Sequence, residues 1–157
     1  MINSESVHIN KIMKNIFLPA KASIVVIFLL LSTVKAQSNY LDEGIMLFNK
    51  KEFEKSKILF EKDLVFNPKS EKSYLYLAKI FNQNNNEEEE EINLKNVLLL
   101  NPQNDEAIYL LTLLKIKQSD YDEAKQLIVQ FDLVCKSFCS KKSEIKEKFE
   151  KLSPKNE

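Results

Sequence analysis

Apolar residues recur along most of the chain at the spacing of amphipathic helices. In one segment Tyr74, Leu77, Ala78 and Phe81 fall at i, i+3, i+4 and i+7, which places all four on one side of a helix. Polar and charged residues occupy the positions between them. Patterns of this kind predict seven helices, at about 39–50, 52–66, 71–83, 87–100, 105–118, 121–135 and 141–152.

Two similar five-residue strings show that these helices repeat. The string LVFNP at 64–68 and the string LLLNP at 98–102 end at Pro68 and Pro102. Because the residue before a proline disfavours the α region, each string ends a helix. The two strings lie one period of about 34 residues apart, a length typical of stacked helical hairpins rather than of one closed core.

Alignment on this period brings similar residues into common columns. The first helix of each hairpin opens with Tyr40, Tyr74 or Ile108, and four positions later a small residue follows, which lets the paired helix approach closely: Gly44, Ala78 and Thr112. The second helix contributes three further columns: Ser56, Glu90 and Ala124; Phe60, Leu94 and Ile128; Asp63, Val97 and Phe131.

These columns resemble the tetratricopeptide repeat (TPR), whose pattern is an aromatic residue, a Leu-small pair, a second aromatic, and then Ala, Phe and a closing Pro. The resemblance covers 37–138 as three units of about 37–70, 71–104 and 105–138, followed by a capping helix and tail at 139–157. It implies an all-α fold, a short right-handed α-solenoid of three helical hairpins plus a C-terminal capping helix. Four residues depart from the pattern and are expected to weaken their units: Glu43, Glu90, Lys115 and Lys136.

The first 36 residues have the features of a secretory signal peptide. Lys11, Lys14 and Lys21 precede an uncharged run from 22 to 34, and Val34 and Ala36 have the spacing that a signal peptidase recognises. Only 13 residues are uncharged, whereas a membrane-spanning helix needs about 20. We therefore expect an exported protein, periplasmic or secreted. The alternative is a membrane anchor formed by the uncleaved segment.

Composition narrows the functional classes. Cleavage after Ala36 would leave 121 residues with 19 Lys, no Arg, no His and 22 acidic residues. This mildly acidic chain lacks the basic face that supplies most of the affinity for nucleic acid. It also lacks the commonest general base, the histidine side chain. We predict no enzymatic activity and no cofactor, and a protein or peptide as partner, with membrane contact only if the N-terminal apolar segment is retained.

A run of five glutamates, 87–91, is the most conspicuous charged feature. Consecutive glutamates on a helix point in different directions and cannot enclose a cation. Acidic residues in the first turn interact favourably with the helix dipole, so the run is interpreted as a solvated helix start. The carboxylate pair Asp120 and Asp122 also lies at a helix start, where such residues serve as caps.

Cys135 and Cys139 stand four residues apart between the last repeat and the capping helix. They do not form a Cys-x-x-Cys redox motif, and a zinc site would need two more ligands from a chain that offers neither His nor further Cys after residue 36. In an oxidising compartment they would form a structural disulfide. Otherwise they are two ordinary thiols.

The TPR resemblance implies a binding groove lined by the first helix of each hairpin. Carried over position by position, it selects twelve residues: Leu41, Ile45, Phe48, Asn49, Lys72, Leu75, Lys79, Asn82, Tyr109, Leu113, Ile116 and Lys117. The leading hypothesis is therefore an exported, non-enzymatic adaptor or scaffold that binds another protein through this concave groove. The alternative is a structural subunit of an envelope assembly, membrane-tethered or self-associating.

Overall fold

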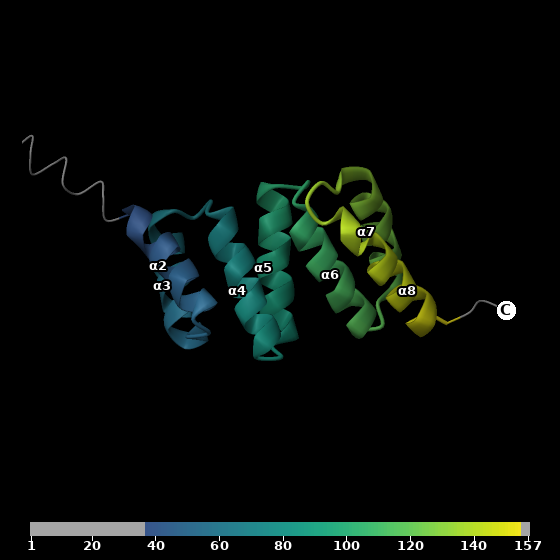
Figure 1. Cartoon of the computed structure of the whole chain (residues 1–157), viewed down its shortest axis with the longest axis horizontal. Coiled ribbons are helices and arrows are strands. Elements are labelled where there is room, and N and C mark those ends of the chain that lie inside the picture. The colour runs from purple at the N-terminus through teal and green to yellow at the C-terminus, as the bar shows by residue number, and fades with distance from the viewer. Residues whose placement is uncertain (1–36, 155–157) are drawn as a thin grey trace, which may run out of the picture. The chain divides into compact units, whose positions relative to one another are not determined.

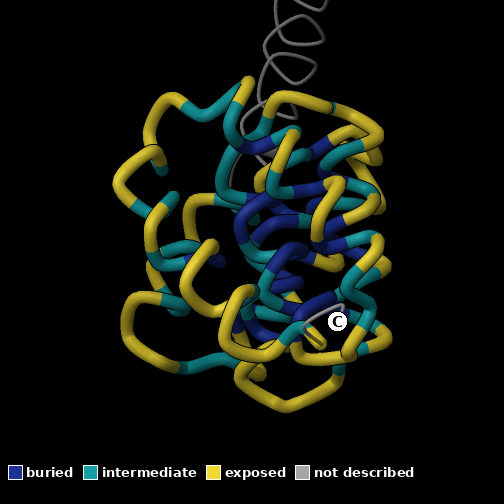
Figure 2. The backbone as a smooth tube through the Cα atoms, turned by 90° about the vertical axis from the view of Figure 1, so that its right-hand side faces the viewer, coloured by how far each residue is buried: buried dark blue, intermediate teal, exposed yellow. Residues whose placement is uncertain are grey.

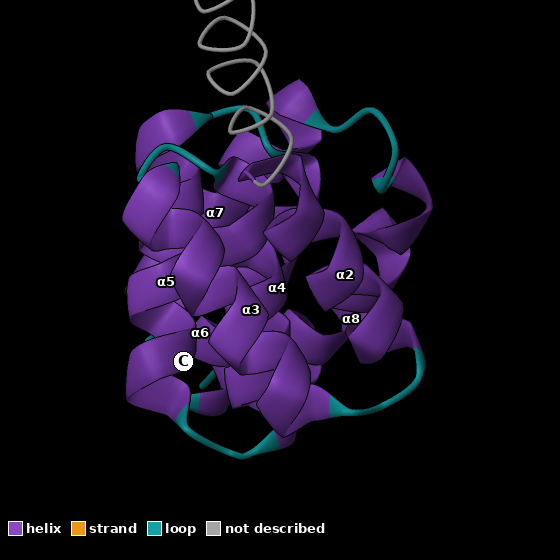
Figure 3. Cartoon of the chain, turned by 90° about the vertical axis from the view of Figure 1, so that its left-hand side faces the viewer, coloured by secondary structure: helices purple, strands orange, loops and turns teal. Residues whose placement is uncertain are grey.

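A computed structural model of the chain describes residues 37–154, with side chains from residue 40 onward. These residues form helices and turns, with no strand among them (Figures 1 and 3). The seven predicted helices are confirmed, each end lying within about two residues of its expected place. Their bounds are α2 Gln37–Asn49, α3 Phe53–Phe66, α4 Glu71–Gln83, α5 Glu87–Leu100, α6 Asp105–Lys117, α7 Tyr121–Val134 and α8 Lys142–Leu152, with a short 3₁₀ turn, η2, at Cys139–Lys141.

The helices pair as three hairpins, α2–α3, α4–α5 and α6–α7, which follow one another in chain order and end at α8 (Figure 1). The predicted leader, 1–36, lies outside the described residues. Between residues 37 and 154 no helix is both long and apolar enough to span a bilayer. The all-α solenoid predicted from the sequence is confirmed.

The turn inside each hairpin has the same backbone geometry in all three repeats. Lys51, Asn85 and Ser119, which occupy the same position of successive repeats, adopt left-handed φ values of 62°, 55° and 61°. One residue later the chain closes back on the first helix through equivalent backbone hydrogen bonds, from Glu52 N to Leu47 O, Asn86 N to Phe81 O and Asp120 N to Lys115 O. These bonds are the 6→1 closures of a helix C-terminus, a place where glycine is usual.

The small residues at the Gly44 position of each repeat were expected to let the paired helix approach closely, and the structure shows this close approach at Gly44. A Cβ added to Gly44 would lie 2.7 Å from Cε1 of Phe60, well inside van der Waals contact. The Ser56 hydroxyl donates a 2.8 Å hydrogen bond to the Gly44 carbonyl, which fixes α3 against α2 at this point. In the second repeat the positions equivalent to Gly44 and Phe60 hold Ala78 and Leu94. The extra methyl group of Ala78 is therefore accompanied by a smaller side chain on the facing helix.

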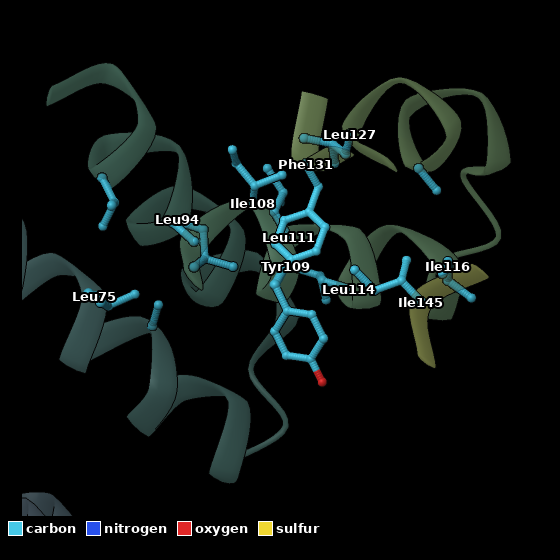
Figure 4. Packing of buried hydrophobic residues seen from close by; sticks show 14 residues of the cluster. Leu75, Leu94, Ile108, Tyr109, Leu111, Leu114, Ile116, Leu127, Phe131 and Ile145 are labelled. Carbon is cyan, nitrogen blue, oxygen red and sulfur yellow. The ribbon is translucent and has the colours of Figure 1, made fainter. Parts of the chain in front are cut away.

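Two clusters of buried apolar side chains form the core, which lies inside the stack of helices (Figure 2). The larger cluster is built from α4 to α8 and includes Leu94, Ile108 and Phe131 (Figure 4). The smaller one consists of Phe60, Leu77 and Ile80 with partly buried residues of α2 to α4 packed around them. Helix α4 contributes to both clusters, so it joins the first hairpin to the rest of the described chain.

A buried polar chain links α3 to α4 at the first repeat junction. The Ser70 hydroxyl donates to Ser73 Oγ at 3.0 Å, and the Ser73 hydroxyl donates to Asp63 Oδ2 at 2.5 Å. Asp63 is 2% exposed. One period later the positions equivalent to Asp63 and Ser73 hold Val97 and Ala107, which are both fully buried and apolar. The chain therefore uses a matched polar pair at one junction and a matched apolar pair at the next.

Three of the four departures from the TPR pattern have hydrogen-bond or ion-pair partners within the fold. Buried Glu90 accepts two hydrogen bonds from Asn82 Nδ2, at 2.9 and 3.0 Å. Lys115, 5% exposed, is surrounded by acidic side chains. The Lys136 backbone N–H donates to Asp105 Oδ2 at 2.7 Å, a bond that proline could not make. The fourth, Glu43, is exposed.

Candidate functional site

Three of the twelve predicted groove residues belong to the core. Leu75 and Tyr109 are each 8% exposed, Ile116 is 4% exposed, and all three lie within the larger cluster. Leu75 and Tyr109 are therefore corrected from partner-binding residues to core residues, and Ile116 is a core residue that also lines a cavity between α6 and α8. The residue-by-residue transfer selected them because it ranks positions on one helix and takes no account of the helix that packs next to it.

Helix α8 covers the first helix of the third repeat at Tyr109. The Tyr109 hydroxyl, which points away from Leu111 and Phe131 in Figure 4, donates a 2.9 Å hydrogen bond to Glu144 Oε1. Hydrogen bonds from Lys141, Tyr109 and Lys148 lower the pKa of Glu144 to about 2. These contacts, with the fully buried Ile145 of α8, leave no open groove at Tyr109.

A cavity of about 400 Å³ lies between α6 and α8. Its apolar lining comes from Leu113 and Ile116 of α6 and Leu152 of α8, and its cationic lining is Lys117, Lys148 and Lys151. Three of these six, Leu113, Ile116 and Lys117, belong to the predicted groove. The three α8 residues Lys148, Lys151 and Leu152 were not among the predicted groove residues, because α8 lies outside the three repeats and was expected to be only a cap, although the three recur at helical spacing.

The lysines around this cavity differ in how far they are neutralised. Lys117 pairs with Glu87 at 2.9 Å, and Lys148 pairs with Glu144 at 3.2 Å. Lys151 is exposed and has no ion-pair partner among residues 40–154. The cavity therefore combines an apolar lining with one uncompensated positive charge near its rim.

The predicted groove residues of the first two repeats lie beside the smaller cluster. Leu41, Ile45 and Phe48 are partly buried against it. The Phe48 ring also contacts the ring of Tyr76, with centroids 5.0 Å apart, which ties α2 to α4. These apolar residues support the packing between repeats, and only their exposed parts are accessible to a partner.

The polar members of the predicted groove differ in their availability. Lys79 pairs with Glu106 at 2.5 Å and lies 4.9 Å from the centre of the Tyr76 ring, so its charge serves the contact between α4 and α6. Asn82 is occupied with Glu90. Asn49 and Lys72 are exposed.

The glutamate run is a helix start, as predicted, but it is not simply solvated. Asn86 caps α5 by accepting the backbone N–H of Glu89, and Glu88 is exposed. Glu91, in contrast, lies 2.7 Å from the Lys115 ammonium. Burial alone would raise the pKa of Glu91, but hydrogen bonds from Lys115 and Lys95 outweigh it and lower the pKa to about 2.

Lys115 replaces the second aromatic of the TPR pattern and works as an electrostatic link. Its ammonium reaches Glu91 on α5 and, at 3.1 Å, Glu123 on α7. Burial alone would lower its pKa, but these two carboxylates raise it. One acidic partner lies in the helix before α6 and the other in the helix after it, so a comparison of equivalent repeat positions could not have paired them.

Cys135 and Cys139 form a disulfide, with Cα atoms 5.2 Å apart. The same turn is held by Asp105 Oδ2, which accepts backbone N–H groups from Lys136, Ser137 and Phe138 at 2.6–2.9 Å. Partial burial raises the pKa of Asp105, but these bonds outweigh it and keep the pKa below its usual value. Within 40–154, no three His, Cys, Asp or Glu side chains converge as a metal site.

Solved structures with the same fold include TPR proteins. One, described as "Functional Characterization of Pseudomonas Aeruginosa pilF", has a TM-score of 0.60 and 18% identity; the match covers 75% of this chain and 52% of that one, about half its length. The Sgt2 TPR domain from Aspergillus fumigatus has a TM-score of 0.62 and 17% identity, covering 77% and 86% of the two chains. No protein family and no curated protein matches the sequence. The fold is that of a TPR solenoid.

Proposed function

We propose that this chain is a non-enzymatic adaptor that binds a segment of another protein at the cavity between α6 and α8. The observation that carries the proposal is the composition of this cavity: an apolar lining of Leu113, Ile116 and Leu152 with Lys151 uncompensated at its rim. An aliphatic side chain would fill the apolar part. A carboxylate next to it would meet the positive charge.

The test uses three short fluorescent peptides. The first carries a leucine beside two glutamates, the second has lysines in place of the glutamates, and the third has serine in place of the leucine. Fluorescence anisotropy of each peptide with the purified chain is expected to show tightest binding for the first. Equal binding of all three, or none, would count against the proposal.

Variants at the cavity locate the binding. Lys151→Glu is expected to weaken binding of the acidic peptide about tenfold, and Leu152→Ser by a similar factor, since each removes one of the two matching features. Both residues are exposed, so neither change should alter the fold. Lys50→Glu and Met46→Ser, at exposed positions outside the cavity, are the matched controls.

We also propose that the chain is exported. The N-terminal pattern of charged, apolar and small residues supports this, and the Cys135–Cys139 disulfide is of a type found in oxidising compartments. Mass spectrometry of the protein recovered from an envelope or culture fraction is expected to give a chain that begins at Gln37. A mass that includes 1–36 would instead support the tethered alternative.

A further inference from the structure

A second cavity, also of about 400 Å³, lies between the start of α7 and the end of α8. Part of its lining is aromatic, formed by the ring of Tyr121 on α7 and the ring of Phe149 on α8, whose centroids are 6.1 Å apart. Its charged lining consists of Asp120, Asp122 and Lys125. We call it the acidic cavity, and we call the cavity between α6 and α8 the basic cavity. The adaptor function proposed above uses only the basic cavity.

The charges that line the two cavities are opposite in sign. The charged residues of the basic cavity are all lysines, whereas two aspartates and one lysine leave the acidic cavity with a net negative charge. Asp120 is already engaged, because its Oδ1 accepts the Glu123 backbone N–H at 3.1 Å and its Oδ2 lies 3.9 Å from the Lys115 ammonium. Asp122 is exposed and has no ion-pair partner in the part of the chain from 40 to 154. Asp122 is therefore the carboxylate that is available to a ligand.

An aromatic ring next to an available carboxylate suits an organic cation. The negative face of the ring attracts an ammonium or guanidinium group, and the carboxylate adds an ion pair. The chain already uses this combination between α4 and α6, where the Lys79 ammonium lies 4.9 Å from the centre of the Tyr76 ring and pairs with Glu106. Tyr121 and Phe149 are only partly buried, so a side chain from another molecule can reach them.

The two cavities are close together because the same two segments line both of them. Between α6 and α7 the lining passes from Lys117 in the basic cavity to Ser119 in the acidic cavity, and at the end of α8 it passes from Leu152 to Ser153. Since neighbouring Cα atoms are about 3.8 Å apart, each of these pairs is separated by less than about 8 Å. An extended chain advances about 3.3 Å per residue, so a spacer of about three residues bridges the two cavities.

From these features we infer that a single partner segment binds in both cavities. An aliphatic residue with an adjacent carboxylate occupies the basic cavity, and a lysine or arginine about three residues away occupies the acidic cavity. This inference rests on the proposed function and adds to it a second anchor of opposite charge. A segment bound in the reverse direction would bring its carboxylate to Asp122 and its basic side chain to Lys151, so repulsion at both ends fixes the direction of binding.

Fluorescence anisotropy with three longer peptides tests the second anchor. Each peptide contains a leucine followed by two glutamates. The first has an arginine three residues before the leucine, the second has an arginine three residues after the last glutamate, and the third has serine at both places. One of the two arginine peptides is expected to bind about tenfold more tightly than the serine peptide, because only one direction matches the charges.

Two changes in the acidic cavity have opposite expected effects. Asp122→Asn removes the available carboxylate and is expected to abolish most of the gain that arginine provides, while binding of the serine peptide stays the same. Lys125→Ala removes a like charge and is expected to tighten binding of the arginine peptide about threefold. Glu88→Gln is the matched control, because Glu88 is exposed, occupies the position of α5 equivalent to Asp122 on α7, and lies outside both cavities. General damage to a helix start would appear in both of these variants.

The outcomes separate this inference from the proposed function. If the serine peptide binds but neither arginine peptide binds more tightly, the inference is wrong and the proposed function stands. If none of the three peptides binds, both are wrong. A gain from arginine that Asp122→Asn leaves intact would place the arginine outside the acidic cavity, which also overturns the inference.

Amide chemical shifts locate the second anchor and identify its source. The backbone signals of Tyr121 and Lys125 are expected to move with the tighter arginine peptide and to move much less with the serine peptide. Arginine amide alone, at the same concentration, is expected to leave them in place, because the second anchor depends on the first. If arginine amide moves these signals as far as the peptide does, the acidic cavity binds a free small cation and not a partner segment, and the inference is overturned.

Discussion

The contact between Gly44 and Phe60 gives a prediction in which two physical effects have opposite signs. Gly44→Ala in an ordinary helix would stabilise the protein by about 0.5–1 kcal/mol, because alanine loses less backbone entropy on folding. Here the added methyl carbon would lie 2.7, 3.0 and 3.1 Å from three carbon atoms of the Phe60 ring. The favourable and unfavourable contributions can therefore be separated by experiment.

The structure gives little room for the clash to relax. Phe60 is fully buried and its ring stacks on Tyr76, with centroids 5.1 Å apart. The backbone of α2 cannot move away without losing the hydrogen bond from Ser56 to the Gly44 carbonyl. Overpacking by one carbon in a tight core costs about 1–3 kcal/mol. After the entropic gain is subtracted, Gly44→Ala is expected to be destabilising by about 1 kcal/mol.

Urea unfolding followed by far-ultraviolet circular dichroism measures this change, with the slope m checked for constancy. Phe60→Leu supplies the other half of a double-mutant cycle, because it removes the ring atoms that clash. The double variant copies the second repeat, where Ala78 and Leu94 occupy the same two columns. The coupling energy between the two changes is expected to be about 1–2 kcal/mol. If Gly44→Ala is stabilising in the unmodified background, the close approach is not what selects glycine here.

The buried polar groups and the turns give three further predictions. The folded-state pKa values of Glu91 and Glu144 are about 2, against an ordinary 4.5. The stability that these two carboxylates provide is therefore complete above about pH 5 and is lost as the pH falls towards 2. Urea unfolding at a series of pH values should show this decline, and the decline should be shallower in Glu91→Gln. Asp63→Val alone is expected to lower the free energy of unfolding by about 1–3 kcal/mol, because it leaves the Ser73 hydroxyl buried without its acceptor. The double variant with Ser73→Ala copies Val97 and Ala107 of the next repeat and should recover most of that loss in the same assay. If the double variant recovers nothing, the pairing of Asp63 with Ser73 is refuted. Ser119→Gly is expected to raise the unfolding free energy by about 0.5–1 kcal/mol, since φ at this position is 61°, and a lower urea midpoint would contradict it.

The helices of this fold could be predicted from the sequence because each helix has its own apolar spacing, which does not depend on which other helix it contacts. Apolar spacing marked every helix, and Pro68 and Pro102 marked the ends of two of them. Contacts between different positions were not predictable in the same way. Glu91 and Lys115 lie in different repeats and occupy unrelated columns, so each looked like an isolated charge until the structure placed α5 beside α6.

The candidate site shows the same limit. Position-by-position transfer selected Leu113, Ile116 and Lys117, which line the cavity, although Ile116 is 4% exposed and belongs to the larger buried cluster. It also selected Tyr109, which α8 covers. Lys151 and Leu152 belong to a helix outside the three repeats, so the repeat alignment had no column for them.

The division of the core has a mechanical consequence. Of the two buried clusters, the smaller one holds the hairpin nearest the beginning of the chain, and the larger one joins everything from α4 onward. A pulling force applied to the first hairpin would therefore act on the smaller cluster before the larger one. The hairpins would then unfold one after another, each at a modest force. A force applied to the tail would instead act first on α8, whose buried Ile145 belongs to the larger cluster.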